Sequence, residues 1–175
     1  VESLDAENMV LDIEAGSGVW WRFRLTKEAV ETSPVDGTWV ITPEAGSLGV
    51  GPTQGDISWW SIDAAGVDQR SCYFDDTYVF SGGSFSNVLG SETWLEGWQG
   101  VDADGCGAPI APHDGSNPAT FVYDEAAGTL TVSGSGAYIG LPKAHNGGED
   151  GMPVNDTTTY LVNLIDANTM IIDIE

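Results

Sequence analysis

Residues 119–133 read ATFVYDEAAGTLTVS, two short alternating runs on either side of an acidic turn that contains glycine. Within each run, β-branched or aromatic residues alternate with other residues, which is typical of strands that turn one face toward a core. The segment Asp124–Gly128 supplies the polar residues and the glycine that hairpin turns favour. This stretch therefore predicts an antiparallel β-hairpin.

Similar short runs recur along the whole chain, separated by clusters of Gly, Asp, Asn and Pro, and helical periodicity is nearly absent. Two long polar loops are expected at 100–118 and 143–157. With 175 residues, 41% of them hydrophobic, the length suits one domain with a sizeable core. The sequence predicts an all-β, jelly-roll-like β-sandwich with antiparallel sheets and long loops, spanning residues 1–175. The expected strands are 38–42, 57–61, 70–80, 84–89, 92–98, 119–124, 128–133, 137–141 and 158–164.

The chain is strongly acidic, with 27 Asp and Glu against 5 Lys and Arg and a formal net charge of −22. Phosphate backbones and anionic lipid surfaces are bound mainly by Lys and Arg, so neither nucleic acid nor a membrane is an expected partner. No apolar run approaches the ~20 residues of a membrane span, and no signal peptide is recognisable at Val1. We expect a processed or excised piece of a larger protein that is secreted or held at the outer cell surface.

The thiols are Cys72 and Cys106, and neither lies in a CxxC motif or beside a histidine at ligand spacing. Zinc is therefore not expected. Two interpretations stay open, a disulfide that closes a long loop, as in exported proteins, and two separate buried thiols.

The two ends of the chain are alike. Residues 4–14 read LDAENMVLDIE and residues 165–175 read IDANTMIIDIE, and the first copy continues through a Gly-Ser-Gly turn into a tryptophan-rich strand. In one interpretation, two strands of one sheet happen to be alike; in the other, the parent protein carries neighbouring copies of one module. In the second case residues 1–28 are the tail strands of a preceding copy and 36–175 form the main body. Residues 19–25 are then expected to join the sheet of the C-terminal strands.

Seven tryptophans form the second unusual feature of the sequence. Trp20-Trp21 and Trp59-Trp60 are adjacent pairs in predicted strands. Neighbours in a strand point to opposite faces, so one member of each pair is expected to leave the core. Trp94 and Trp98, four residues apart, are expected on one strand face. Exposed indoles can stack on sugar rings, although core filling explains some of the tryptophans equally well. The candidate ligand-binding residues are Trp59, Trp60, Trp94, Trp98, Trp20, Arg70, Asp76, Glu96 and His113.

Catalysis is not expected from the carboxylates. Glu92 and Glu96 would lie ~13 Å apart in a strand, farther than a glycosidase acid and its partner. The Glu-x-Asp-x-x-Glu pattern of laminarinase-type hydrolases is missing, because Trp94 stands in the place of the central Asp. Arg22 and Arg24 are expected to form ion pairs with acidic neighbours. Asp75, Asp102 and Asp104 offer oxygen ligands for a structural Ca²⁺ ion, although the complete calcium-loop pattern is missing.

Several strings resemble modules of surface glycan-binding proteins from bacterial polysaccharide-utilisation systems and of proteins that accompany laminarin-degrading enzymes. They are Gly37-Thr38-Trp39-Val40, Leu48-Gly49-Val50-Gly51-Pro52, Trp59-Trp60-Ser61 and Phe74-Asp75-Asp76-x-Tyr78-x-Phe80. The resemblance covers most of residues 37–98 and both ends of the chain. It implies a β-sandwich that binds a β-glucan such as laminarin, a β-1,3-glucan, without cleaving it. Two alternatives stay open, a glycoside hydrolase or lyase domain acting on marine-type polysaccharide and a structural repeat of a Ca²⁺-dependent adhesin.

Overall fold

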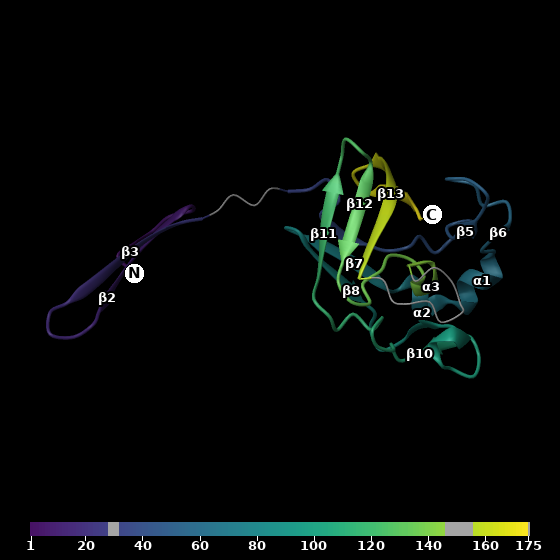
Figure 1. The fold of residues 1–175 in the computed structure, drawn as a ribbon, viewed down its shortest axis with the longest axis horizontal. Coiled ribbons are helices and arrows are strands. Elements are labelled where there is room, and N and C mark those ends of the chain that lie inside the picture. The colour runs from purple at the N-terminus through teal and green to yellow at the C-terminus, as the bar shows by residue number, and fades with distance from the viewer. Residues whose placement is uncertain (28–31, 146–155, 175) are drawn as a thin grey trace. The chain divides into compact units, whose positions relative to one another are not determined.

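The computed structural model describes residues 1–27, 32–145 and 156–174 (Figure 1). The chain divides into two compact units, Val1–Glu31 and Thr32–Glu175. Strands make up 40% of the structure and helices 10%, and the strands pair antiparallel. The predicted all-β, sandwich-like fold is therefore confirmed.

The larger unit is built on a curled seven-stranded antiparallel sheet with the order β14-β13-β12-β11-β8-β7-β4. The hairpin predicted at 119–133 forms its β11–β12 pair, with Phe121 opposite Val132. The carboxylate of Asp124 accepts a hydrogen bond of 3.0 Å from the backbone N–H of Ala127 and thereby closes the turn. The strands are β4 (Gly37–Trp39), β7 (Thr77–Ser81), β8 (Ser84–Val88), β11 (Ala119–Asp124), β12 (Thr129–Ser133), β13 (Thr157–Asp166) and β14 (Thr169–Asp173).

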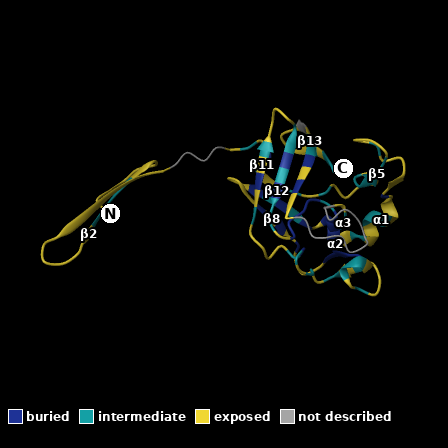
Figure 2. Ribbon diagram, in the orientation of Figure 1, coloured by how far each residue is buried: buried dark blue, intermediate teal, exposed yellow. Residues whose placement is uncertain are grey.

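One face of this sheet carries the main hydrophobic core. Burial alternates along β7, β8 and β12, so every second residue points inward (Figure 2). Phe80 lies at the centre, with its ring centroid 4.9 Å from that of Phe85 and 5.0 Å from that of Phe121. Residues 137–141 were expected as a strand and instead run as an irregular buried segment. The Tyr160 hydroxyl accepts a hydrogen bond of 2.9 Å from the Ile139 N–H, which ties this segment to the core.

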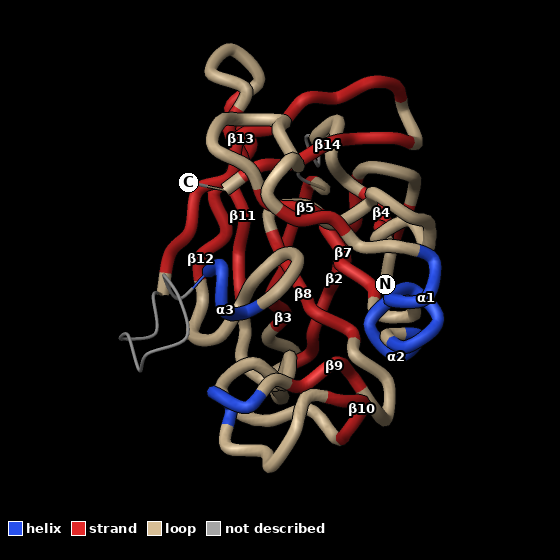
Figure 3. The backbone as a smooth tube through the Cα atoms, turned by 90° about the vertical axis from the view of Figure 1, so that its right-hand side faces the viewer, coloured by secondary structure: helices blue, strands red, loops and turns tan. Residues whose placement is uncertain are grey.

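Smaller elements surround a second core at one side of the sheet, with α1 and α2 adjacent to each other (Figure 3). Its buried residues come from the helices, from β9 and from the loops between them. They are Ile62, Cys72, Tyr73, Phe74, Trp94 and Leu141. The elements are β5 (Gly49–Val50), β6 (Trp60–Ser61), α1 (Ala64–Gln69), α2 (Ser71–Phe74), β9 (Thr93–Leu95), η1 (Gly97–Gln99), β10 (Gly105–Gly107) and α3 (Pro142–His145).

The strand predicted at 70–80 is wrong in its first half, because residues 64–74 form two short helices. Asp63 caps α1, its side chain accepting a hydrogen bond of 2.7 Å from the Gly66 N–H. The aromatic residues Tyr73 and Phe74, which read as strand formers, are buried from α2. The strand predicted at 92–98 is likewise shorter, since it ends at Leu95 and a 3₁₀ turn follows.

The disulfide between Cys72 and Cys106 is confirmed, and the alternative of two separate thiols is wrong. The two Cα atoms lie 6.0 Å apart, and the bond joins α2 to β10. It therefore links two short elements of the second core that are distant in sequence.

The smaller unit is a three-stranded antiparallel sheet with the order β1-β2-β3, made of β1 (Ser3–Leu4), β2 (Asn8–Glu14) and β3 (Trp20–Thr26). The expectation that residues 19–25 join the sheet of the C-terminal strands is wrong, since β3 pairs with β2 along its whole length. A local turn explains why β3 pairs with β2, although β14 has nearly the same sequence as β2. The tight Gly16-Ser17-Gly18 turn, where φ is positive at all three residues, joins β2 directly to β3. Closing so short a loop costs little entropy.

Candidate functional site

The candidate site centres on Trp59 and Trp60 at the β5–β6 hairpin. Trp59 is 70% exposed and Trp60 is 43% exposed, so neither indole of this pair fills the core. The Trp59 N–H donates to the Val50 carbonyl at 3.0 Å, and β6 pairs with β5 at Trp60 and Val50. A Cβ at Gly51 would lie 2.1 Å from the Asp56 carbonyl oxygen, so the loop can close this tightly only with glycine. The backbone thus holds two neighbouring indoles at the surface.

Arg70 lies between the Trp59–Trp60 pair and the second core. Its Cζ atom is 4.5 Å from the ring centroid of Trp94 and 5.7 Å from that of Trp60, so the guanidinium contacts both indoles. Such cation–π contacts stabilise by about 0.5–2 kcal/mol. The Nη1 atom is buried and has no hydrogen-bond partner among the described residues. We call Trp59, Trp60 and Arg70 together the tryptophan surface.

Trp94 and Trp98 do not share a strand face, and that prediction is wrong. Trp94 is 4% exposed and belongs to the second core, where it supports Arg70 from below the surface. Trp98 lies in η1 after the strand has ended, and it is half-buried. For Trp94 the alternative of core filling therefore holds.

Glu96 and His113, predicted as ligand contacts, are buried and engaged with other side chains. One Glu96 carboxylate oxygen lies 2.9 Å from the Lys143 Nζ atom, and the other accepts a hydrogen bond of 3.2 Å from the indole N–H of Trp98. The His113 ring centroid lies 5.6 Å from that of Trp98 and 5.8 Å from that of Tyr138, in edge-to-face contacts. Both residues thus fix the η1 region, and the Lys143–Glu96 pair was missed because its partners are remote in sequence.

Asp76 is 2% exposed, the most deeply buried of the predicted polar site residues. The Thr93 hydroxyl donates to its Oδ2 atom at 2.6 Å, whereas its Oδ1 atom has no hydrogen-bond partner among the described residues. The pKa of Asp76 is raised to about 7, mainly by burial and to a smaller extent by the charge of Asp75, while the Thr93 hydrogen bond opposes the rise. Asp76 therefore exchanges a proton near neutral pH.

The raised pKa makes the effect of Asp76 on stability depend on pH. Below its ordinary pKa of 3.8 the group is protonated in both states, but between pH 4 and about 7 only the unfolded chain ionises freely. The contribution of Asp76 to stability is thus present at low pH and lost as pH rises through this window. We expect Asp76→Asn to gain stability relative to the wild type from pH 4 to 7 and to level off above, as measured by urea denaturation.

The matched control is Asp68→Asn, which removes an exposed carboxylate of α1 that is not among the causes of the raised pKa of Asp76. Its stability relative to the wild type should change little over the same pH range. A constant difference between Asp76→Asn and the wild type from pH 4 to 8 would contradict the raised pKa.

Trp20 belongs to the smaller unit, where it is exposed and lies opposite Glu14. The expected ion pairing is confirmed for Arg22, whose guanidinium pairs with Asp12 and Glu2. Asp12 binds it through both carboxylate oxygens, at 2.8 and 2.6 Å.

The three aspartates considered for Ca²⁺ do not form a cluster. Asp104 accepts a hydrogen bond of 2.9 Å from the Gly97 N–H, and Asp75 ends α2. Within residues 1–27, 32–145 and 156–174 there is no group of three or more His, Cys, Asp or Glu side chains that could hold a metal ion. The Ca²⁺ ion, with Asp102 as a further ligand, stays a prediction.

The sequence was compared with protein families, with curated proteins and with solved structures, and none of the three comparisons found a match. In the described part of the chain, no helix combines the length and the apolar character needed to cross a membrane.

Proposed function

We propose that this chain is a non-catalytic carbohydrate-binding module that binds its ligand at the tryptophan surface. The observation that carries the proposal is the exposure of the adjacent Trp59 and Trp60, with the Arg70 guanidinium against the Trp60 ring. Indole faces stack on the C–H faces of sugar rings, and large exposed apolar groups commonly mark binding sites. The planar Arg70 fork suits sugar hydroxyls at the edge of such a stack.

A β-glucan such as laminarin is the ligand class that we propose. The resemblance of residues 37–98 to glycan-binding modules supports this choice. The net charge of −22 also favours a neutral glycan, because a polyanionic one would be repelled. The disulfide is compatible with a secreted or cell-surface location, where the protein would encounter polysaccharides.

Isothermal titration of the protein with laminarin tests the proposal. Trp59→Ala and Trp60→Ala are each expected to weaken binding about tenfold or more, because a lost stacking contact of about 1.4 kcal/mol corresponds to a factor of ten. The matched control is Trp21→Ala, which removes an indole that is 60% exposed in the smaller unit. Its affinity for laminarin should equal that of the wild type. Equal affinity in all four proteins would overturn the tryptophan surface as the site.

Asp76 keeps a catalytic alternative open, because a carboxyl group with a pKa of about 7 suits proton transfer. Its burial argues against contact with a glycosidic oxygen in this conformation. Release of reducing sugar from laminarin, abolished in Asp76→Asn or Glu96→Gln, would favour a hydrolase or lyase. A glycan array probed with and without EDTA separates these classes from the structural repeat, which would bind no glycan and would respond to Ca²⁺.

A further inference from the structure

Two strands of nearly the same sequence, β2 and β14, have different surroundings. Both are preceded by the same turn: Asp5 accepts hydrogen bonds from the N–H groups of Glu7 and Asn8 at 2.8 and 2.7 Å, and Asp166 accepts one from the Asn168 N–H at 2.7 Å. Each strand then pairs antiparallel with the strand before it. Only β2 has a further partner on its other side, which is β3.

The inner face of β14 shows what the corresponding face of β2 is suited for. Met170 and Ile172 of β14, and Ile174 just after the strand, pack against the main core. Their counterparts in β2 are Met9, Leu11 and Ile13, and these lie opposite Leu25, Phe23 and Trp21 of β3. The face that β3 shares with them is exposed in the smaller unit, with Leu25 46%, Phe23 43% and Trp21 60% accessible. Strand β3 therefore presents a core-type face that the smaller unit itself leaves uncovered.

The outer edge of β14 lacks a partner strand. It is the last strand of the seven-stranded sheet, and no backbone hydrogen bond joins it to any described residue other than those of β13. On this strand the Asp173 carboxylate accepts a hydrogen bond from the Gly55 N–H at 3.1 Å. An open edge of this kind is a template for adding a strand.

We propose that β3 of a second copy of this chain adds to the free edge of β14, antiparallel and in the register that β3 has with β2. In this register Leu25 lies opposite Met170, and Phe23 lies opposite Ile172. The apolar face of β3 then continues the core face of the sheet. This inference concerns self-association and does not depend on the proposed glycan binding.

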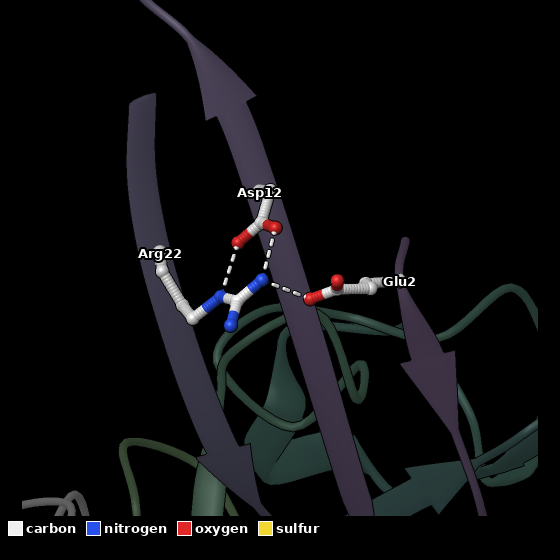
Figure 4. Close-up of polar contacts among 3 residues, drawn as sticks. All are labelled: Glu2, Asp12 and Arg22. Atoms are coloured by element: carbon white, nitrogen blue, oxygen red, sulfur yellow. Dashed lines mark hydrogen bonds and ion pairs between the residues drawn. The ribbon is translucent and has the colours of Figure 1, made fainter. Parts of the chain in front are cut away.

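The outer face of the strand supplies charge complementarity. Arg22 pairs with both carboxylate oxygens of Asp12 in its own unit, and Glu2 adds a further contact (Figure 4). Asp173 is the counterpart of Asp12 in β14, so the proposed register brings Arg22 opposite Asp173. A slip of one residue would turn the apolar residues of β3 to the outer face, which selects this register.

Strand exchange is favoured because the smaller unit is poorly suited to stand alone. Small sheets solvated on both faces are marginally stable in water. Pairing with β14 replaces the backbone hydrogen bonds that β3 makes with β2 and adds burial of its apolar side chains. The same strands occur in both copies, so the exchange can be reciprocal and close into a twofold dimer.

Sedimentation velocity over a range of protein concentrations tests the proposal with charge variants of the full chain. The wild type is expected to dimerise, and Asp173→Arg is expected to raise the dissociation constant about tenfold or more, because like charges would lie opposite each other. Adding Arg22→Asp to Asp173→Arg should restore the dimer. The matched control is Asp68→Arg, the same charge change on the exposed side of α1. A wild type that stays monomeric at all concentrations, or an Asp173→Arg variant that dimerises like the control, would overturn the proposal.

The register is tested by cross-linking two singly substituted chains. Arg22→Cys is mixed with Asp173→Cys under mild oxidation, and a disulfide-linked heterodimer is expected, because opposite residues in antiparallel strands have Cα atoms close enough for a disulfide. Using Arg24→Cys in place of Arg22→Cys moves the thiol two residues along the same face. The yield of the disulfide-linked heterodimer should then fall several-fold. Equal yields from the two mixtures would contradict this register.

Discussion

Replacing Cys72 and Cys106 together by serine is expected to lower the free energy of unfolding by about 4 kcal/mol. The bond closes a loop across a sequence separation of 34 residues, and the chain-entropy relation gives a value of this size for such a loop. The structure adds a second reason. The bond joins a four-residue helix to a three-residue strand, elements too short to hold their places by backbone hydrogen bonds alone.

Urea denaturation of the double variant Cys72→Ser/Cys106→Ser measures this loss. The control is the wild type treated with a reducing agent, which should unfold at the same urea concentration as the variant. A loss below about 1 kcal/mol would mean that the second core holds without the bond, contrary to this account.

Phe80→Ala is expected to cost about 3–5 kcal/mol, the range found when a buried aromatic side chain is removed from a packed core. Phe80 is 1% exposed, and its ring lies against two other phenylalanine rings. Its removal leaves a cavity bordered by Phe85 and Phe121, which are themselves held by strand pairing and cannot easily move in to fill it.

The matched control for Phe80→Ala is Val122→Ala, a truncation on the outer face of β11 at a side chain that is 67% exposed. That change should alter stability by no more than about 0.5 kcal/mol. Similar losses in the two variants would contradict the assignment of the core to the Phe80 face of the sheet.

The features that could be predicted from the sequence are those that depend on local pattern. Alternation over 119–133 predicted the β11–β12 hairpin correctly, because period-two burial is a property of each strand alone. The presence of a Trp59–Trp60 indole at the surface could also be predicted, because adjacent residues of a strand point to opposite faces. The structure exposes both indoles where one was expected.

The features that could not be predicted depend on contacts between distant segments. Residues 70–74 have strand-forming aromatics, but Asp63 caps a helix before them and the second core takes up Tyr73 and Phe74. Trp94 is buried because Arg70 and the disulfide region pack around it, which strand spacing cannot reveal. The partner of β3 was also mistaken, because β2 and β14 offer it almost the same sequence.

The indole N–H resonances of the seven tryptophans, followed by NMR during a laminarin titration, test the central claim most directly. Trp39 provides an internal reference, because its indole N–H is bound to the Val35 carbonyl at 2.8 Å in the main core region. We expect the signals of Trp59 and Trp60 to shift with added glycan while that of Trp39 stays in place. Unchanged signals from Trp59 and Trp60 at saturating laminarin would contradict glycan binding at the tryptophan surface.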